Sequence, residues 1–188
     1  VAYRAYHAMP PLTTPDGEPS NAVFGFANML LKAVADLKPT HVVAAFDVGK
    51  TFRHEEYEAY KATRAETPDD LRVQFDRIKE LVRTFGVPIY EKVGFEADDV
   101  LGTLTKQAEK EGIDSVILTG DSDTFQLISE HVHVLYPQGR TATPIIMDIE
   151  SVEERYGLSP AQLIDLKALV GDSSDNIPGV SGIGAKTA

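Results

Sequence analysis

The sequence predicts an α/β fold in which a mainly parallel central sheet is flanked by helices. Short runs of β-branched and apolar residues alternate with longer segments whose apolar residues recur every three or four positions. When strands alternate with helices, the crossovers make the strands parallel and place helices on both faces of the sheet. The 188 residues suffice for one α/β domain of ordinary size, or for one such domain with a small addition.

The elements follow from these patterns in chain order. Buried strands are expected at 41–46, 87–90 and 115–118, with further short strands at 132–136 and 144–147. Helices are expected at 22–35, from Thr67-Pro68 to Gly86, at 96–110, at 151–156, and after the capping box Ser159-Pro160-Ala161-Gln162. Val1–Met9 has no initiator methionine and no strand before it, which indicates an internal fragment of a longer gene product.

Composition excludes several classes of protein. The absence of cysteine excludes disulfides and thiolate metal sites, and no run of 18 apolar residues could span a membrane. No signal peptide is visible, so a cytoplasmic protein is expected. The formal net charge of −11, taken alone, argues against a nucleic-acid ligand, because domains that bind phosphates are usually basic.

Acidic residues follow three predicted strands and one predicted helix. They are Asp47 after the first strand, Glu96, Asp98 and Asp99 after the second, Asp121 and Asp123 after the third, and Asp172 and Asp175 after the capped helix. Sites in open α/β sheets form beyond the carboxyl ends of the strands, so three of the four groups should converge. Converging carboxylates repel one another unless cations compensate them, and hard ions such as Mg²⁺ prefer oxygen ligands.

The spacing within these groups favours shared metal sites. Glu96 and Asp99 lie at i,i+3 on one helix face, as do Asp172 and Asp175 if that turn is helical. Two ions about 3.5–4 Å apart can clamp an in-line phosphoryl displacement. Each acid alone is more typical of a helix cap, a turn or a solvated charge than of a metal ligand, and only the joint pattern of the four groups favours a metal site. Removing the eight from the 29 acidic residues leaves 21 against 18 Lys and Arg, a net charge of −3, so a local basic face remains compatible with DNA.

The segment 49–67 is polar, charged and rich in tyrosine, with no apolar face wide enough to dock on a core. It is therefore expected to project and to be mobile. Tyr57, Tyr60, Lys61 and Arg64 have helical spacing, so Tyr could stack on an unpaired base while Lys and Arg meet phosphates. A solvent-exposed helix with intrahelical ion pairs such as Glu58 with Lys61 fits the same residues equally well.

Closely spaced glycines punctuate the end of the sequence. Gly179, Gly182 and Gly184 precede Lys186 in the pattern GVxGIGxKTA, which resembles the helix-hairpin-helix element of DNA-binding proteins. Such a turn exposes backbone N–H groups that bind a phosphate without reading base sequence. An ordinary tight turn is the alternative interpretation. The spacing does not match a Walker A loop.

The motifs AYRAYHA, AAFDVGKTFRHEEYEAYKATR, GFEADDVLGTL, LTGDSDTFQL and GDSSDNIPGVSGIGAKTA together resemble the 5′-nuclease domain of bacterial DNA polymerase I, in the flap endonuclease superfamily. The resemblance runs through essentially the whole chain in order. It implies a PIN-like, flap-endonuclease-like fold with a helical arch and a C-terminal helix-hairpin-helix. The expected division is a nuclease core at 1–158, including the arch segment 49–67, and a helical DNA-binding region with a truncated helix-hairpin-helix at 159–188.

The resemblance also implies an activity. The family's enzymes are metal-dependent 5′→3′ exonucleases and 5′-flap endonucleases in primer removal and repair. Two or more Mg²⁺ or Mn²⁺ ions are implied, with K⁺ at the helix-hairpin-helix. The implied partners are DNA with a 5′ flap or 5′ end and a polymerase domain in the same parent chain, in a monomer of the bacterial cytoplasm associated with the nucleoid.

The family's functional positions carry over by motif. The eight carboxylates match its metal ligands, with Asp121, Asp123, Asp172 and Asp175 as the more outlying set. Lys61 and Arg64 match the arch cations that contact the scissile phosphate, Arg53 assists them, and Arg4 matches a cation near the site. Tyr60, Gly179, Gly182, Gly184 and Lys186 are the expected DNA contacts. The family carries a further metal-binding Asp on an early strand before Ala2, so a weak or inactive fragment is expected.

Three other functions fit parts of the pattern. One is a non-catalytic binder of flapped or branched DNA. Another is a phosphotransferase that uses Asp47 as a nucleophile at a strand end. The third is an RNA-cutting relative with a similar acidic sheet edge.

Overall fold

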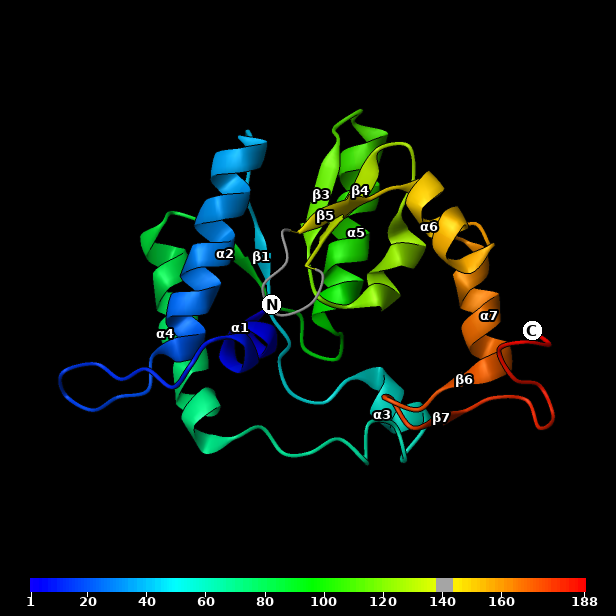
Figure 1. Ribbon diagram of the computed structural model, residues 1–188, viewed down its shortest axis with the longest axis horizontal. Coiled ribbons are helices and arrows are strands. Elements are labelled where there is room, and N and C mark those ends of the chain that lie inside the picture. Colours follow the sequence, from blue (N-terminus) through cyan, green and yellow to red (C-terminus); the bar gives the residue numbers. More distant parts are fainter. Residues whose placement is uncertain (138–143) are drawn as a thin grey trace. The chain divides into compact units, whose positions relative to one another are not determined.

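The computed structural model describes residues 1–137 and 144–188, in which helices and short strands alternate along the chain (Figure 1). The predicted α/β class is confirmed. The chain divides into two compact units, which are described separately. The first consists mainly of Val1–Phe46 and Glu66–Glu91. The second consists of Asp47–Ala65, Lys92–Tyr136 and Pro144–Ala188.

The first unit contains α1 (Ala2–Ala8), α2 (Asn21–Leu37), β1 (Ala44–Ala45), α4 (Asp69–Thr84) and β2 (Ile89–Tyr90). β1 and β2 pair in parallel, with Ala44 opposite Ile89 and Ala45 opposite Tyr90. The strands expected at 41–46 and 87–90 are therefore present, but only two residues of each take part in the ladder. The helix expected at 22–35 is two residues longer at its C-terminal end and one residue longer at its N-terminal end.

The core of the first unit forms where α4 faces α2. Leu71, Ile78 and Val82 are fully buried, and their spacing of seven and then four residues places them on one face of α4. The helix expected to start at Thr67-Pro68 begins one residue later than predicted, because Pro68 occupies the N-cap and Asp69 is the first helical residue. Leu71, Ile78 and Val82 pack with Ala22 and Phe26 of α2.

A close approach of α1 to α2 completes this core. No element was predicted for Val1–Met9, yet α1 is a helix whose Ala5 is 1% exposed. A Cβ on Gly25 would lie 3.0 Å from Ala5 Cβ and 2.9 Å from Met9 Cγ, so glycine is required for the two helices to lie this close. The small residues of AYRAYHA are thus explained by packing.

The second unit holds the remaining elements. They are α3 (Phe52–Glu56), α5 (Ala97–Lys110), β3 (Ser115–Leu118), the 3-10 helix η1 (Ser122–Leu127), β4 (Val132–Tyr136), β5 (Ile145–Met147), α6 (Ile149–Tyr156), α7 (Gln162–Val170), β6 (Gly171–Asp172) and β7 (Ile177–Pro178). β3 and β4 pair in parallel, and β5 joins β4 antiparallel. β6 and β7 form an antiparallel hairpin. The described strands thus form three small sheets, of which the β1–β2 and β3–β4 pairings are parallel.

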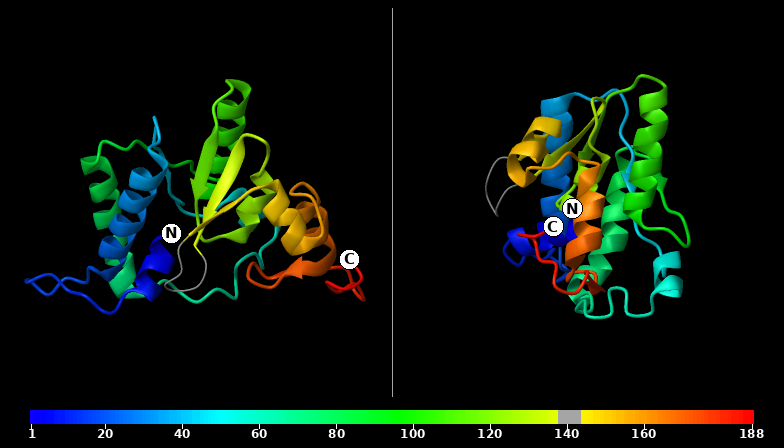
Figure 2. Two further views of the ribbon diagram at one scale, coloured as in Figure 1. Left: turned by 45° about the horizontal axis from the view of Figure 1, so that its top comes forward. Right: turned by 90° about the vertical axis from the view of Figure 1, so that its right-hand side faces the viewer.

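The sheet of β3, β4 and β5 carries the core of the second unit. Phe125 of η1, Val134 of β4 and Val152 of α6 are fully buried, and Met147 of β5 and Leu163 of α7 pack with them. α5 lies against β3, and α6 against β5 (Figures 1 and 2). Among the described residues, no helix is long and apolar enough to cross a membrane.

The prediction for the segment 49–67 is wrong in its geometry. Only Phe52–Glu56 is α-helical, and turns follow from Glu58 onward. Tyr57, Tyr60, Lys61 and Arg64 therefore do not share a helical face. The segment docks rather than projects, because polar contacts, and not an apolar face, hold it to the second unit.

The acidic turn and the glycine tail also differ from expectation. Asp172 and Asp175 lie in the hairpin of β6 and β7, not on a helix. Residues 181–188 form turns, with one helical-type hydrogen bond from Ala188 N–H to Gly184 C=O at 3.0 Å. A Cβ on Gly179 would lie 2.3 Å from the Val170 carbonyl carbon, so this glycine is explained by backbone packing against the end of α7.

Gln74 is expected to stabilise the start of α2. It is fully buried, and its Oε1 accepts the Ala22 N–H at 2.7 Å while its Nε2 donates to Asn21 Oδ1 at 3.0 Å. The substitution Gln74→Met would leave these buried groups without partners and should lower the free energy of unfolding by about 1–3 kcal/mol. Urea denaturation followed by circular dichroism measures the change. Gln107→Met, at an exposed position of α5, is the control, and an equal loss in both variants would contradict the prediction.

Candidate active site

The N-terminus of α5 gathers carboxylates from two segments. Glu96 is the N-cap residue, and its N–H donates to Asp99 Oδ2 at 2.9 Å. Asp47 Oδ1 accepts the Ala97 N–H at 2.7 Å. Unpaired N–H groups and the helix dipole stabilise negative charge at this end of a helix. Glu96 and Asp99 therefore cap the helix, as the simpler interpretation held, and Asp47 is brought to the same helix end, as the strand-end argument predicted.

Asp98 lies at the centre of this group. Burial and then the charges of Asp121, Asp47 and Glu96 raise the pKa of its carboxyl to about 6, while the charge of Lys61 opposes the shift. These four acids, which come from three separate segments, therefore lie within electrostatic range of one another. The convergence predicted for the strand ends is met by these four side chains.

Arg53 holds the Asp99 carboxylate. Arg53 Nη1 and Nη2 donate to Asp99 Oδ2 and Oδ1 at 2.7 and 2.8 Å, a bidentate pair. The hydrogen bonds from Arg53 hold the pKa of Asp99 below its usual value. Glu96 pairs with Lys61 instead. Glu96 and Asp99, which were expected to share one metal from positions i and i+3 of the helix, therefore have different partners.

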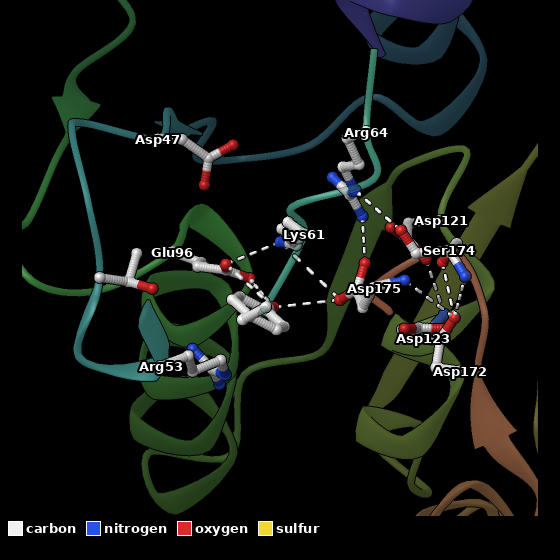
Figure 3. Close-up of polar contacts among 12 residues, drawn as sticks. Asp47, Arg53, Lys61, Arg64, Glu96, Asp121, Asp123, Asp172, Ser174 and Asp175 are labelled. Atoms are coloured by element: carbon white, nitrogen blue, oxygen red, sulfur yellow. Dashed lines mark hydrogen bonds and ion pairs between the residues drawn. The ribbon is translucent and has the colours of Figure 1, made fainter. Parts of the chain in front are cut away.

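Tyr60 and Lys61 connect α5 with the β6–β7 hairpin (Figure 3). Lys61 Nζ lies 2.7 Å from Glu96 Oε1 and 3.9 Å from Asp175 Oδ2. The Tyr60 hydroxyl donates toward Glu96 Oε1 at 3.1 Å and Asp175 Oδ2 at 3.0 Å. Burial and these two carboxylates raise the Tyr60 pKa, which keeps the phenol a donor. Tyr60 is only 5% exposed, so its expected stacking on a base stays a prediction that would require the segment to open.

Arg64 reaches the same hairpin. Its guanidinium forms an ion pair with Asp175, and its Nε donates to the Ser174 carbonyl at 3.3 Å. Asp175 is 8% exposed, and its ion pair with a half-exposed arginine compensates the buried charge. Lys61 and Arg64, the two expected arch cations, thus form ion pairs with the carboxylates, and Arg64 remains half-exposed.

Lys167 joins the outlying acids. Its ammonium pairs with Asp123, and with Asp172 Oδ2 at 2.7 Å. Although burial acts to raise the pKa of Asp172, hydrogen bonds from Lys167 and from Ser174 bring it below its usual value. Burial raises the pKa of Asp123, although Lys167 opposes that shift. Sequence reasoning missed both Lys167 and Ser174. The only sequence feature that could have pointed to Lys167 is its place in α7, five residues before Asp172.

Asp121 has a local structural role as well. Its Oδ1 accepts the Asp123 N–H at 2.9 Å and caps η1, as a turn-forming aspartate does. Its charge nevertheless acts on both Asp98 and Asp123. Asp121 therefore links the group at α5 with the group around Lys167.

A cavity of about 400 Å³ opens beside these acids. Asp98, Asp99 and Asp123 line one part of it. Phe52 and Phe95 line another, with ring centroids 5.7 Å apart. The volume lies within the range typical of small-ligand sites.

Comparison with known protein families shows which family the chain belongs to. The family model "5′-3′ exonuclease, N-terminal resolvase-like domain" matches residues 1–157. The chain belongs to the 5′-3′ exonuclease family. A second model of this family, "5′-3′ exonuclease, C-terminal SAM fold", matches residues 158–188.

Named relatives agree with this assignment. The chain is 52% identical to DNA polymerase I of Chloroflexus aurantiacus over 193 residues, and 53% identical to the thermostable DNA polymerase I of Thermus thermophilus over 189 residues. Each alignment covers the whole of this chain but only 20% and 22% of the relative. The chain therefore spans about a fifth of the length of these polymerases.

Solved structures share the fold. The bacteriophage T5 5′-exonuclease with bound zinc has a TM-score of 0.76 at 24% identity, covering 99% of this chain and 69% of that one. A T5 flap endonuclease complex with DNA and metal ions has a TM-score of 0.72 at 26% identity, covering 87% and 63%. The flap-endonuclease-like fold expected from the motifs is confirmed.

The donor set fits a hard divalent cation in its chemistry. All eight residues offer carboxylate oxygens, and the pKa of Asp98 is raised by burial and then by the negative charges of Asp121, Asp47 and Glu96. Within residues 1–137 and 144–188, however, no three acids or histidines are arranged as ligands of a single ion. Lys61 and Lys167 lie between pairs of them instead. The metal roles of the eight acids stay predictions.

The remaining expected site residues lie elsewhere. Arg4 belongs to α1 of the first unit. Gly179, Gly182, Gly184 and Lys186 lie in the tail after β7, where Gly182 has a φ of +83° that favours glycine. The DNA-binding roles of these five residues stay predictions.

The raised pKa of Asp98 predicts a pH-dependent effect on stability. Ionising this carboxyl disfavours folding only above its ordinary pKa of 3.8, and the full effect is reached above about pH 6. With EDTA present, Asp98→Asn should therefore raise the free energy of unfolding by about 1–3 kcal/mol at pH 8 and hardly at all at pH 4. Urea denaturation at both pH values measures the difference. The control is Asp16→Asn in an exposed loop, and a gain for Asp98→Asn that is equal at pH 4 and pH 8 would contradict the assignment.

Proposed function

We propose that this chain is the nuclease part of a divalent-metal-dependent 5′-nuclease, which hydrolyses phosphodiester bonds in DNA at a 5′ end or 5′ flap. The observation that carries the proposal is the group of Asp47, Glu96, Asp98 and Asp121 around the start of α5, with Lys61 beside it. Membership of the 5′-3′ exonuclease family supports the reaction. The division into a core at 1–158 and a DNA-binding region at 159–188 belongs to the proposal.

The proposed cofactor is Mg²⁺ or Mn²⁺. One set of ligands is Asp47, Glu96, Asp98 and Asp121, and the other is Asp123, Asp172 and Asp175 with Asp121. Such ions supply positive charge at the scissile phosphate and lower the pKa of an attacking water. The T5 relatives with bound metal ions support a divalent cation. Asp99 is assigned to orienting Arg53, because its carboxylate already accepts two hydrogen bonds from that side chain.

The cations of the segment 49–67 serve the substrate in this proposal. Lys61 and Arg64 would bind phosphate oxygens that carry developing charge in the transition state. Arg53 fixes the start of the segment to α5 through Asp99. The cavity beside Asp98 and Asp123 provides volume for a nucleotide next to the reacting phosphate.

The wider setting is proposed from the relatives. DNA with a 5′ flap is the proposed partner, supported by the T5 complex with DNA. The polymerase relatives support a polymerase region in the parent protein, acting as a monomer in the bacterial cytoplasm near the nucleoid. The tail with Gly182 and Lys186 is proposed to bind the duplex backbone, with K⁺ at that turn.

The reaction is tested with a 5′-flapped duplex and Mg²⁺ or Mn²⁺. The full-length parent protein is expected to release the flap, and Asp98→Ala should slow release by at least about 100-fold, the size of effect typical of a lost transition-state contact. Asp16→Ala is the charge-matched control, and circular dichroism checks folding. Absence of cleavage, or cleavage unaffected by Asp98→Ala, would refute the proposal. Salt-dependent binding to the flap without cutting would instead favour a non-catalytic binder of branched DNA.

Lys61 is expected to act in the chemical step. Lys61→Met should lower the single-turnover cleavage rate by about 100-fold, because one donor to a developing charge is lost. Lys50→Met removes the same charge at an exposed position just before α3 and should change the rate little. Equal effects of the two substitutions would show that only the net charge of the segment matters.

A further inference from the structure

The turns after α3 are held to the second unit by polar groups that meet candidate metal ligands. Backbone contacts fix their position, because the Lys61 N–H donates to the Asp175 C=O at 2.9 Å and the Asn176 side chain donates to the Ala59 C=O at 2.8 Å. Residues 59–64, named here the docked turn, thus lie along the turn between β6 and β7.

Three side chains of the docked turn compensate two carboxylates. Lys61 lies between Glu96 and Asp175, Arg64 pairs with Asp175, and the Tyr60 hydroxyl contacts both acids (Figure 3). Glu96 belongs to the N-cap of α5 and Asp175 to the hairpin, so the docked turn also ties these two elements together. Tyr60 is buried, so the phenol is an integral part of the contact.

Divalent cations and these side chains compete for the same oxygens. Mg²⁺ requires carboxylate oxygens at about 2.0–2.1 Å, and an ammonium 2.7 Å from Glu96 Oε1 occupies that position. Two positive charges at such separations repel strongly in a partly buried site. A cation that binds Glu96 must therefore displace Lys61, and one that binds Asp175 must weaken the hold on Arg64.

The backbone of the docked turn favours release once these contacts are lost. Lys61 has a φ of +57°, a left-handed conformation that a residue with a side chain adopts only under constraint. The ion pairs of Lys61 with Glu96 and Asp175 and its backbone hydrogen bond to the Asp175 C=O hold the residue in this conformation. Without them, the residue gains access to its ordinary conformations.

We propose that the docked turn is a counter-ion latch, in which divalent cations in the two ligand sets take the place of Lys61 and Arg64 on Glu96 and Asp175 and thereby free both side chains for substrate phosphate. The latch rests on the proposed function, because it uses the same acids as metal ligands. It couples metal binding to the exposure of the cations, so that DNA meets them only when the metals are in place. Linkage requires the coupling to be reciprocal, so a weakened latch must strengthen metal binding by the same factor.

Trypsin cleavage reports directly on opening of the latch, because the protease must bind the side chain of Lys61 or Arg64 in its own specificity pocket. Cleavage after these residues tracks the population in which the docked turn is open. The chain is digested with EDTA or with saturating Mn²⁺, without DNA, and the free Mn²⁺ is measured by its paramagnetic resonance signal. Cutting after Lys61 and Arg64 is expected to accelerate at least about fivefold with Mn²⁺, the lower end of typical coupling. Cutting after Lys32 in α2 is the internal control.

Tyr60→Phe tests the coupling with a single atom removed. The variant should be cut faster in EDTA, should respond less to Mn²⁺, and should bind Mn²⁺ more tightly by the factor by which the latch is weakened. Tyr57→Phe removes the same atom from a tyrosine that is 39% exposed in the same segment and should behave like the unmodified chain. If Tyr60→Phe fails to fold, the cleavage rates of the unmodified chain in EDTA and in Mn²⁺ still test the latch.

The outcomes separate the latch from the proposed function. Bound Mn²⁺ with accelerated cutting at Lys61 and Arg64 supports the latch. Bound Mn²⁺ with unchanged cutting at both positions overturns it and leaves the metal-dependent nuclease intact. If the chain binds no Mn²⁺, the metal site and the latch both fail.

Discussion

The structure of the second unit depends on how negative charge at the start of α5 is compensated. Asp98 lies within electrostatic range of three other acids, and its pKa is raised first by burial and then by their charges. The helix N-terminus offsets part of that charge through the N–H groups that Glu96, Asp99 and Asp47 organise. Lysine and arginine side chains offset more. The turns after α3, α7 and the β6–β7 hairpin each contribute a cation or an acid to this network, and α7 is also held by Leu163 in the apolar core.

The contacts form a chain of alternating charge through the second unit. Arg53 meets Asp99, Lys61 meets Glu96 and Asp175, Arg64 meets Asp175, and Lys167 meets Asp123 and Asp172. Such partly buried pairs contribute little net stability, because desolvation offsets much of the attraction. Their significance is positional, since they bring segments that are distant in sequence to one place. A site built in this way can exchange its cations without disturbing the apolar core around Phe125.

The sequence predicted the parts of the fold that periodicity determines. The stripe of Leu71, Ile78 and Val82 located α4, and the β-branched run at Ser115–Leu118 located β3, because apolar burial follows residue spacing directly. The acids after the strands could be identified as candidates, and Asp47, Glu96 and Asp121 act electrostatically on Asp98, but their role as metal ligands stays a prediction. The arrangement of Tyr60, Lys61 and Arg64 was not predicted, since their spacing suggests a helix while their contacts are made with residues more than 30 positions away. Lys167 was missed for the same reason, because its partner Asp123 lies 44 residues earlier.

The hairpin of Asp172 and Asp175 lies against the end of α7 through close backbone contacts, in addition to the ion pair of Lys167 with Asp172. A Cβ on Gly171 would lie 2.4 Å from the Gly179 nitrogen, and one on Gly179 would collide with the Val170 carbonyl. Ile177 and Val180, which lie beside this crossing, are 41% and 49% exposed. Two positions of the hairpin are therefore closed to every other amino acid, while their neighbours are open to many. The placement of both acids therefore depends on main-chain shape at these two glycines as well as on the side chains that contact the carboxylates.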